Sequence, residues 1–139
     1  MRGHRRSVAA VLVVVLGLVA SACSRDREVE TALGELDAFT QALLAKAKAG
    51  PTPQAGVDEA QKYLDAGGPA LKGKLAALKS IRGFQISAET KKKLESRFVA
   101  NATAVAGLQL EYAMQAARDD GFRQRVAKLA NDYRTLIVG

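Results

Sequence analysis

Only two residues in the chain carry a thiol or an imidazole, the groups that most often serve as nucleophiles, general bases or metal ligands. They are Cys23 and His4, and the chain has no tryptophan. A single cysteine cannot form an internal disulfide. The position of Cys23 is informative, because it directly follows the small residues Ala20-Ser21-Ala22 at the end of an apolar run.

The first 23 residues have the three parts of a secretory signal. A basic cluster lies in residues 1–6, and an apolar run over residues 7–22 carries no ionisable side chain. The run ends in the A-x-A pattern of Ala20 and Ala22, where small side chains let a peptidase reach extended backbone. The basic end stays on the cytoplasmic side of a membrane. We therefore expect the rest of the chain to be exported.

This segment resembles the signal of bacterial lipoproteins, whose lipobox is commonly Leu, a small residue, Gly or Ala, and then Cys. Here the box reads Ala20-Ser21-Ala22-Cys23, with Ala20 in place of the usual Leu. The resemblance implies cleavage between Ala22 and Cys23 and attachment of fatty acids such as palmitate at Cys23. It also implies, for a diderm source, that Ser24 in place of Asp sorts the protein to the periplasmic face of the outer membrane.

Two other interpretations of the segment stay open. The general signal peptidase could cut after Ala22 and release a secreted protein with an unmodified Cys23. The apolar run could also persist as an uncleaved anchor, although it is shorter than the roughly 20 residues that span a bilayer comfortably. We favour lipidation, because a free thiol at this position would be a liability in an oxidising compartment.

Removal of residues 1–22 leaves 117 residues, with 18 basic and 14 acidic side chains and a net charge of +4. His4 is lost with them. Zinc sites of His and Cys, His-ligated haem and His-dependent triads are then excluded. The chain has no glycine-rich nucleotide motif and no G-x-S-x-G motif. We therefore expect a protein that is not an enzyme, with no metal, no cofactor and no nucleic-acid partner.

Helical periodicity dominates the mature chain, and no segment alternates with the period of a strand. A first helix is predicted from about Asp26, where acidic side chains suit the helix start, to Gly50-Pro51, which stops it. Its apolar stripe recurs at spacings of three and four residues: Val29, Leu33, Leu36, Thr40, Leu43 and Ala47.

Thr52 and Pro53 predict the cap and first residue of a second helix. We expect it to cover residues 53–82 and to be kinked, rather than divided in two, at Gly67-Gly68-Pro69. Its apolar positions are Val57, Ala60, Leu64, Leu71, Leu75, Leu78 and Ile81.

Ser87 is the expected cap of a third helix that runs to Arg118. Asp119-Asp120-Gly121 then forms a turn and a cap before a fourth helix. The third stripe is Leu94, Phe98, Val105, Leu108 and Tyr112, with Asn101 or Ala102 in the gap, and the fourth is Phe122, Val126, Leu129, Tyr133 and Leu136.

Four apolar stripes joined by short turns can be buried only against one another. We therefore predict an all-α protein, an antiparallel up-and-down bundle of four helices. Its domain would cover residues 26–139, after a signal peptide at 1–22 and a lipidated N-terminus with a short tether at 23–25.

Lys91-Lys92-Lys93 is the densest run of charge in the chain. Such a run is usually a solvated helix face. Lysines near a helix start nevertheless oppose the helix dipole. We therefore keep contact with anionic lipid headgroups, or with an acidic partner, as an alternative.

Two further features have ordinary structural interpretations, which we favour. Asn101 could fix the register between helices if it were buried, but we expect it at a boundary facing water. Tyr112, Met114, Phe98 and Phe122 could line an apolar pocket, but their spacing is typical of core packing.

The pattern therefore favours a lipid-anchored envelope protein whose bundle is a non-catalytic interaction or scaffold module, with a protein partner in the envelope. One alternative is a carrier or sensor that holds an apolar small ligand between its helices. Another is a secreted periplasmic bundle without lipid.

Overall fold

In the computed structural model, every regular element is a helix within the residues whose backbone is described, 7–82 and 85–139. Side chains are described for residues 25–82 and 85–139. The all-helical prediction is confirmed for this part of the chain. The helices are α1 (Ser7–Ala49), α2 (Pro53–Lys79), α3 (Ala88–Glu111), α4 (Ala113–Ala116) and α5 (Asp120–Val138).

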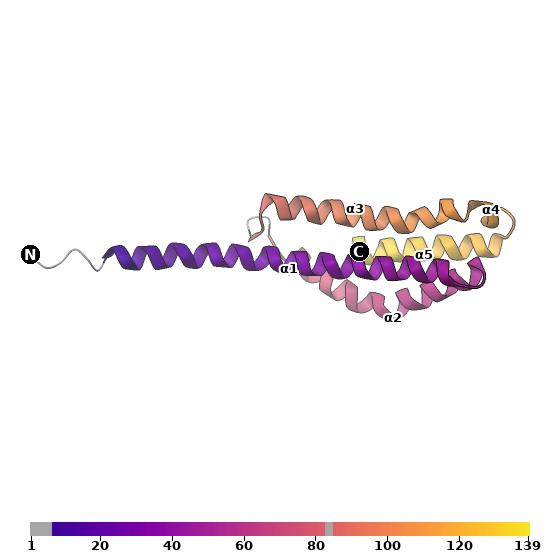
Figure 1. Cartoon of the computed structure of the whole chain (residues 1–139), viewed down its shortest axis with the longest axis horizontal. Helices are drawn as coiled ribbons and strands as arrows, with labels where there is room; N and C mark the ends of the chain where they lie inside the picture. The colour runs from indigo at the N-terminus through magenta and orange to yellow at the C-terminus, as the bar shows by residue number, and fades with distance from the viewer. Residues whose placement is uncertain (1–6, 83–84) are drawn as a thin grey trace, which may run out of the picture.

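The four long helices lie lengthwise along one another, and each reverses the direction of the one before it (Figure 1). The consecutive pairs α1–α2 and α3–α5 pack together, and α1 also packs against α3 while α2 packs against α5. The last two pairs run in the same direction (Figure 1). The consecutive helices α2 and α3 are not one of these closely packed pairs.

The predicted stripe of α1 is confirmed, because all six of its members are buried, with Leu36 and Leu43 fully inaccessible. The helix itself begins at Ser7, well before the expected start near Asp26. No proline occurs between Ser7 and Ala49, and a helix that has nucleated extends at little further cost. Figure 1 shows α1 extending past the other helices on its N-terminal side.

The turn from α1 to α2 brings two stretches of backbone into direct contact. Thr52 caps α2, its hydroxyl accepting a hydrogen bond from the amide of Ala55 (3.2 Å), and Pro53 is the first helical residue, as predicted. A Cβ atom on Gly56 would overlap the carbonyl oxygen of Ala47. The close approach of the two helices at this turn therefore requires glycine.

The second predicted helix is one helix, not two, and it ends at Lys79 instead of residue 82. Pro69 lies inside it and donates no backbone hydrogen bond. Figure 1 shows α2 bowed near its middle. A Cβ atom on Gly67 would lie 2.8 Å from the ring of Phe39 in α1, and one on Gly68 would lie 2.7 Å from Leu136 in α5. The two glycines thus let α2 approach both neighbours.

The predicted third helix is wrong in its extent, because it is divided between α3 and α4 at Tyr112. Tyr112 is buried, and its ring packs edge-on against Phe122 with centroids 5.5 Å apart. Its φ of −99° and ψ of 12° lie outside the helical region. These long-range contacts override the local preference for helix and redirect α4 onto α5.

The other predicted caps are confirmed. Ser87 accepts a hydrogen bond from the amide of Thr90 (3.1 Å) at the start of α3. Asp119 accepts one from the amide of Phe122 (2.9 Å) at the start of α5. On α5 the predicted stripe is buried from Phe122 to Tyr133, whereas Leu136 is partly buried.

Candidate functional site

The predicted lipobox Ala20-Ser21-Ala22-Cys23 and the sorting residue Ser24 lie outside the residues whose side chains are described. The basic cluster of residues 1–6 lies outside the described backbone. The structure describes the side chains that follow Ser24, from residue 25 on. Cys23 precedes Asp26 by less than one helical turn, about 4.5 Å along the axis of α1.

Asp26 joins the first described turn of α1 to the start of α3. Its carboxylate accepts a hydrogen bond from the backbone amide of Ser87 (2.8 Å), and this bond lowers the pKa of Asp26. The segment that enters α3 is therefore held beside the predicted lipidation site. We call residues 25–30, 78–82 and 87–93 together the Cys23-proximal end.

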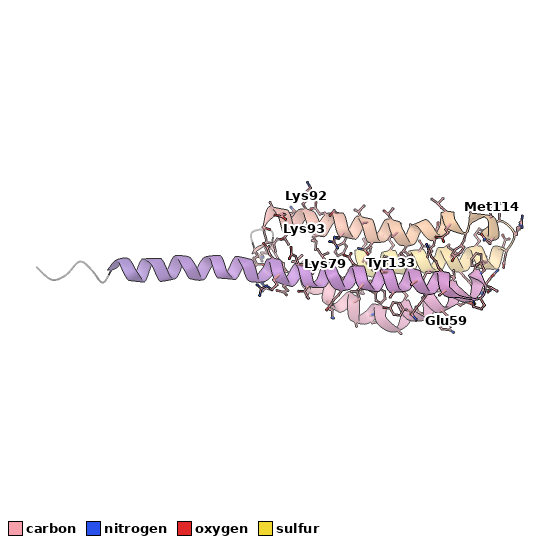
Figure 2. The ribbon with its side chains drawn as sticks, in the orientation of Figure 1. Glu59, Lys79, Lys92, Lys93, Met114 and Tyr133 are labelled. Carbon is pink, nitrogen blue, oxygen red and sulfur yellow. The ribbon has the colours of Figure 1, made fainter. Side chains whose placement is uncertain are left out.

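The three lysines of the predicted charge run have different surroundings. Lys93 lies between Glu30 (3.1 Å) and Glu89 (3.0 Å), and its hydrogen bonds to Glu89 and then Glu30 raise its pKa. Lys91 and Lys92 are exposed and form no ion pair with any described residue. Figure 2 shows Lys92 projecting outward from α3, whereas Lys93 lies on the side facing α1. Of the three lysines, Lys93 thus forms ion pairs within the protein, whereas Lys91 and Lys92 face solvent.

Two further cations at this end were not singled out from the sequence. Arg27 and Arg82 are exposed, and neither forms an ion pair within the described part of the chain. The sequence pattern could have indicated Arg82 as part of a basic surface, because the chain between Asp65 and Glu95 contains seven basic residues and one acidic residue. Arg27 had no such signal, because acidic residues surround it in the sequence.

Asn101 corrects an expectation. It is buried, with 7% of its surface exposed, and its amide donates hydrogen bonds to the carboxylate of Asp37 (2.7 Å) and the carbonyl oxygen of Arg97 (2.8 Å). Arg97 also forms an ion pair with Asp37. The prediction of a water-facing boundary position was wrong, because α1 supplies a polar partner opposite Asn101. This cluster fixes α3 against α1.

Two interior hydroxyl groups, those of Thr40 and Tyr133, are likewise engaged. The hydroxyl of Thr40 donates to the carbonyl oxygen of Leu36 (2.9 Å), so the hydroxyl of Tyr133 donates to Thr40. Burial raises the pKa of Tyr133. These bonds satisfy buried hydroxyls and stabilise the packing of α5 against α1.

The four residues of the alternative apolar pocket do not come together. Tyr112 and Phe122 are buried against each other, but 71% of the surface of Met114 is exposed (Figure 2). Met114 lies in the short helix α4, beyond the end of α3. Phe98 instead lines a separate groove of about 260 Å³ with Leu75, Leu78 and Leu94, flanked by Lys79 and Glu95. Core packing was thus the correct interpretation for Tyr112 and Phe122 and wrong for Met114.

Within the described residues, no three His, Cys, Asp or Glu side chains are grouped so that they could hold a metal ion. Within residues 25–82 and 85–139, no helix has the length and apolar character needed to span a membrane. The chain matches no protein-family model, no curated protein and no solved structure.

Proposed function

We propose that this protein is a lipid-anchored envelope lipoprotein. Its helical domain acts as a non-catalytic interaction or scaffold module, held through Cys23 at the periplasmic face of the outer membrane. The proposal includes a protein partner in the envelope and no metal, cofactor or nucleic acid.

The observation that carries the proposal is the position of the only cysteine in the chain. Cys23 stands after Ala20-Ser21-Ala22, at the exit of a basic and then apolar signal-like segment. Each CH₂ of an attached acyl chain contributes ~0.8 kcal/mol of membrane affinity, so two or three chains hold a protein almost permanently. One thiol at this place is thus sufficient to anchor the whole domain.

We also propose that the four long helices form a bundle of two antiparallel hairpins. The packing of α1 with α2 and of α3 with α5 supports this arrangement, as does the packing between the hairpins. The four-residue α4 then belongs to the connection within the second hairpin. A bundle of this kind presents long, rigid helix faces, which suits a protein that holds a partner at a fixed distance from a membrane.

The engagement of the interior polar groups supports a role without catalysis. The hydroxyls of Tyr133 and Tyr112 are bonded to Thr40 and to the carbonyl oxygen of Ala47, respectively. Neither is aimed at an open cavity, as a catalytic group would have to be. Lys48 and Glu59, whose pKa values are also altered, are exposed members of ion pairs, and Asp119 is an exposed cap. Asp26 is half-buried and accepts the Ser87 amide.

Intact mass measurement of protein extracted from membranes tests the proposal. The wild-type protein should begin at Cys23 and carry the added mass of fatty acids. A Cys23→Ala variant should carry none and should no longer be processed between residues 22 and 23. A wild-type chain cut after Ala22 but unmodified would support secretion without lipid. A chain that retains residues 1–22 would contradict both interpretations.

The groove between Leu75, Leu78, Leu94 and Phe98 favours one second candidate, a carrier or sensor of an apolar small ligand. Its lining is apolar, and its volume of about 260 Å³ would accept part of a lipid-like molecule. Native mass spectrometry distinguishes the two functions. A ligand that co-purifies with the wild type, and is lost in Leu78→Gln, would favour the carrier.

A further inference from the structure

We propose that the Cys23-proximal end docks on anionic lipid headgroups through four cations, Arg27, Arg82, Lys91 and Lys92. The inference rests on the proposed anchoring at Cys23 and names the surface that the anchored domain contacts. Lys93, the third lysine of the run, is not part of this surface, because it forms ion pairs with Glu30 and Glu89 of the same protein.

The acidic residues at this end have partners within the protein. Asp26 is bonded to the amide of Ser87, and Glu28 pairs with Arg25 (2.8 Å). Glu30 and Glu89 both pair with Lys93. Each acidic side chain at this end thus has a hydrogen-bond or ion-pair partner within the protein, whereas the four cations are exposed and form no ion pair with any residue that the structure describes.

The placement of these cations relative to Cys23 decides which surface they meet. Arg27 follows Cys23 by about one turn of α1, and Ser87 is tied to the same turn through Asp26. Lys91 and Lys92 follow Ser87 in the first turns of α3, and Arg82 follows the end of α2. An acylated Cys23 therefore brings all four within reach of the membrane surface.

The position of Lys91 and Lys92 is unfavourable for the isolated protein. Both lie near the positive end of the α3 dipole, where acidic side chains stabilise a helix and basic ones do not. Lys93 is compensated there by two carboxylates, but its two neighbours are not. Anionic headgroups supply the missing negative charge. The opposite end of the domain differs, because the N-cap and the first residue of α5, Asp119 and Asp120, are acidic.

The test uses the mature acylated protein, reconstituted into vesicles of phosphatidylcholine with or without 30% phosphatidylglycerol. The acylated Cys23 thiol cannot be labelled, so an introduced Ala88→Cys carries a fluorophore at the exposed start of α3. A nitroxide on the headgroups quenches this fluorophore when the end is docked. We expect strong quenching on phosphatidylglycerol vesicles at low salt, and little on phosphatidylcholine or in 0.5 M NaCl.

The test variant is Arg82→Gln/Lys91→Gln/Lys92→Gln, in the same labelled background. Each cation near an anionic surface contributes ~1 kcal/mol, which is about fivefold in the docking equilibrium. The triple variant should therefore lower the docked-to-free ratio about 100-fold. The matched control, Lys62→Gln/Arg118→Gln/Arg123→Gln, removes the same charge from the opposite end and should dock like the wild type. Unchanged circular dichroism in both variants shows that the helices are intact.

Equal quenching on neutral and anionic vesicles, or equal losses in the two triple variants, would overturn the inference while leaving the anchoring intact. The mass of the same sample reports acylation separately. If the protein proves to be unacylated, the unlabelled chain is sedimented with the same two kinds of vesicle. Binding to phosphatidylglycerol vesicles that weakens about 100-fold in the test variant supports the docking surface, and no preference between the vesicles contradicts it.

Discussion

The hydroxyl of Tyr112 donates a hydrogen bond to the carbonyl oxygen of Ala47 at a distance of 2.9 Å. Ala47 lies in the last turn of α1, where carbonyl groups have no partner within the helix. Tyr112 occupies the break between α3 and α4. Tyr112 therefore supplies a hydrogen-bond donor to one carbonyl group at the end of α1. It also lies where the third predicted helix is divided.

Replacing Tyr112 with Phe should lower the free energy of unfolding by about 1–3 kcal/mol, because it leaves a buried carbonyl group without a donor. Urea unfolding of the mature protein measures the change. Tyr63→Phe is the matched control, because its ring stacks on Phe39 and its hydroxyl has no hydrogen-bond partner among the described residues. Similar losses in the two variants would show that the Tyr112 bond is not stabilising.

Replacing Gly56 with Ala should destabilise the protein by about 1–3 kcal/mol, because the added methyl group overlaps backbone rather than a movable side chain. Gly73 provides the opposite case on the same helix, since a Cβ there meets nothing within 4 Å. Gly73→Ala should stabilise by about 0.5–1 kcal/mol through helix propensity alone. Thermal unfolding of both variants checks the prediction, which requires shifts of opposite sign.

Replacing Thr40 with Val should cost about 1–3 kcal/mol, because it leaves the buried Tyr133 hydroxyl without an acceptor. Tyr133→Phe should cost less, since Thr40 keeps its bond to the carbonyl oxygen of Leu36. In the double variant much of the loss should be recovered. A double-mutant cycle of unfolding free energies measures the coupling, and purely additive effects would contradict the assigned hydrogen bond.

Acid should destabilise the protein partly through two aspartates that accept backbone hydrogen bonds, Asp119 and Asp26. Backbone hydrogen bonds from Phe122 and Ser87 hold the pKa values of Asp119 and Asp26, respectively, below the usual ~3.9 of an unfolded chain. Their stabilisation is therefore complete above about pH 5. It is lost as the pH falls through the ordinary value toward the lowered folded-state pKa, because the unfolded chain takes up protons first.

Asp119→Asn and Asp26→Asn test this pH dependence, because each asparagine keeps an acceptor oxygen for the backbone hydrogen bond. Both variants should show a shallower loss of unfolding free energy between pH 5 and 2, measured by urea titration at a series of pH values. The double variant should be shallower than either single variant. Slopes identical to that of the wild type would show that these carboxylates do not contribute to acid unfolding.

The helices and their caps follow from short-range information. The bonds at Thr52, Ser87 and Asp119 join residues three apart, so a reader of the chain can recognise them without knowing the fold. The stripe from Val29 to Ala47 is equally local, because helical geometry places positions three and four apart on one face.

Several of the errors concern residues whose partners are distant in the chain. Asn101 is buried because Asp37, sixty-four positions earlier, accepts its hydrogen bond. Tyr112 breaks its helix through contacts with Ala47 and Phe122. From the sequence, the three lysines of the run form one group. In the structure, Glu30 of α1 pairs with Lys93 and so distinguishes it from the other two.

From residue types and their spacing alone one can therefore derive the helical class, three caps, most of the core and the prediction that Cys23 is the anchor. Packing in three dimensions was needed to learn where α3 ends, which polar residue is buried and which cations at the Cys23-proximal end are left for another surface. The physical reason is the range of the interactions: caps and stripes depend on neighbours within two turns, whereas charge pairing and burial depend on which helices meet.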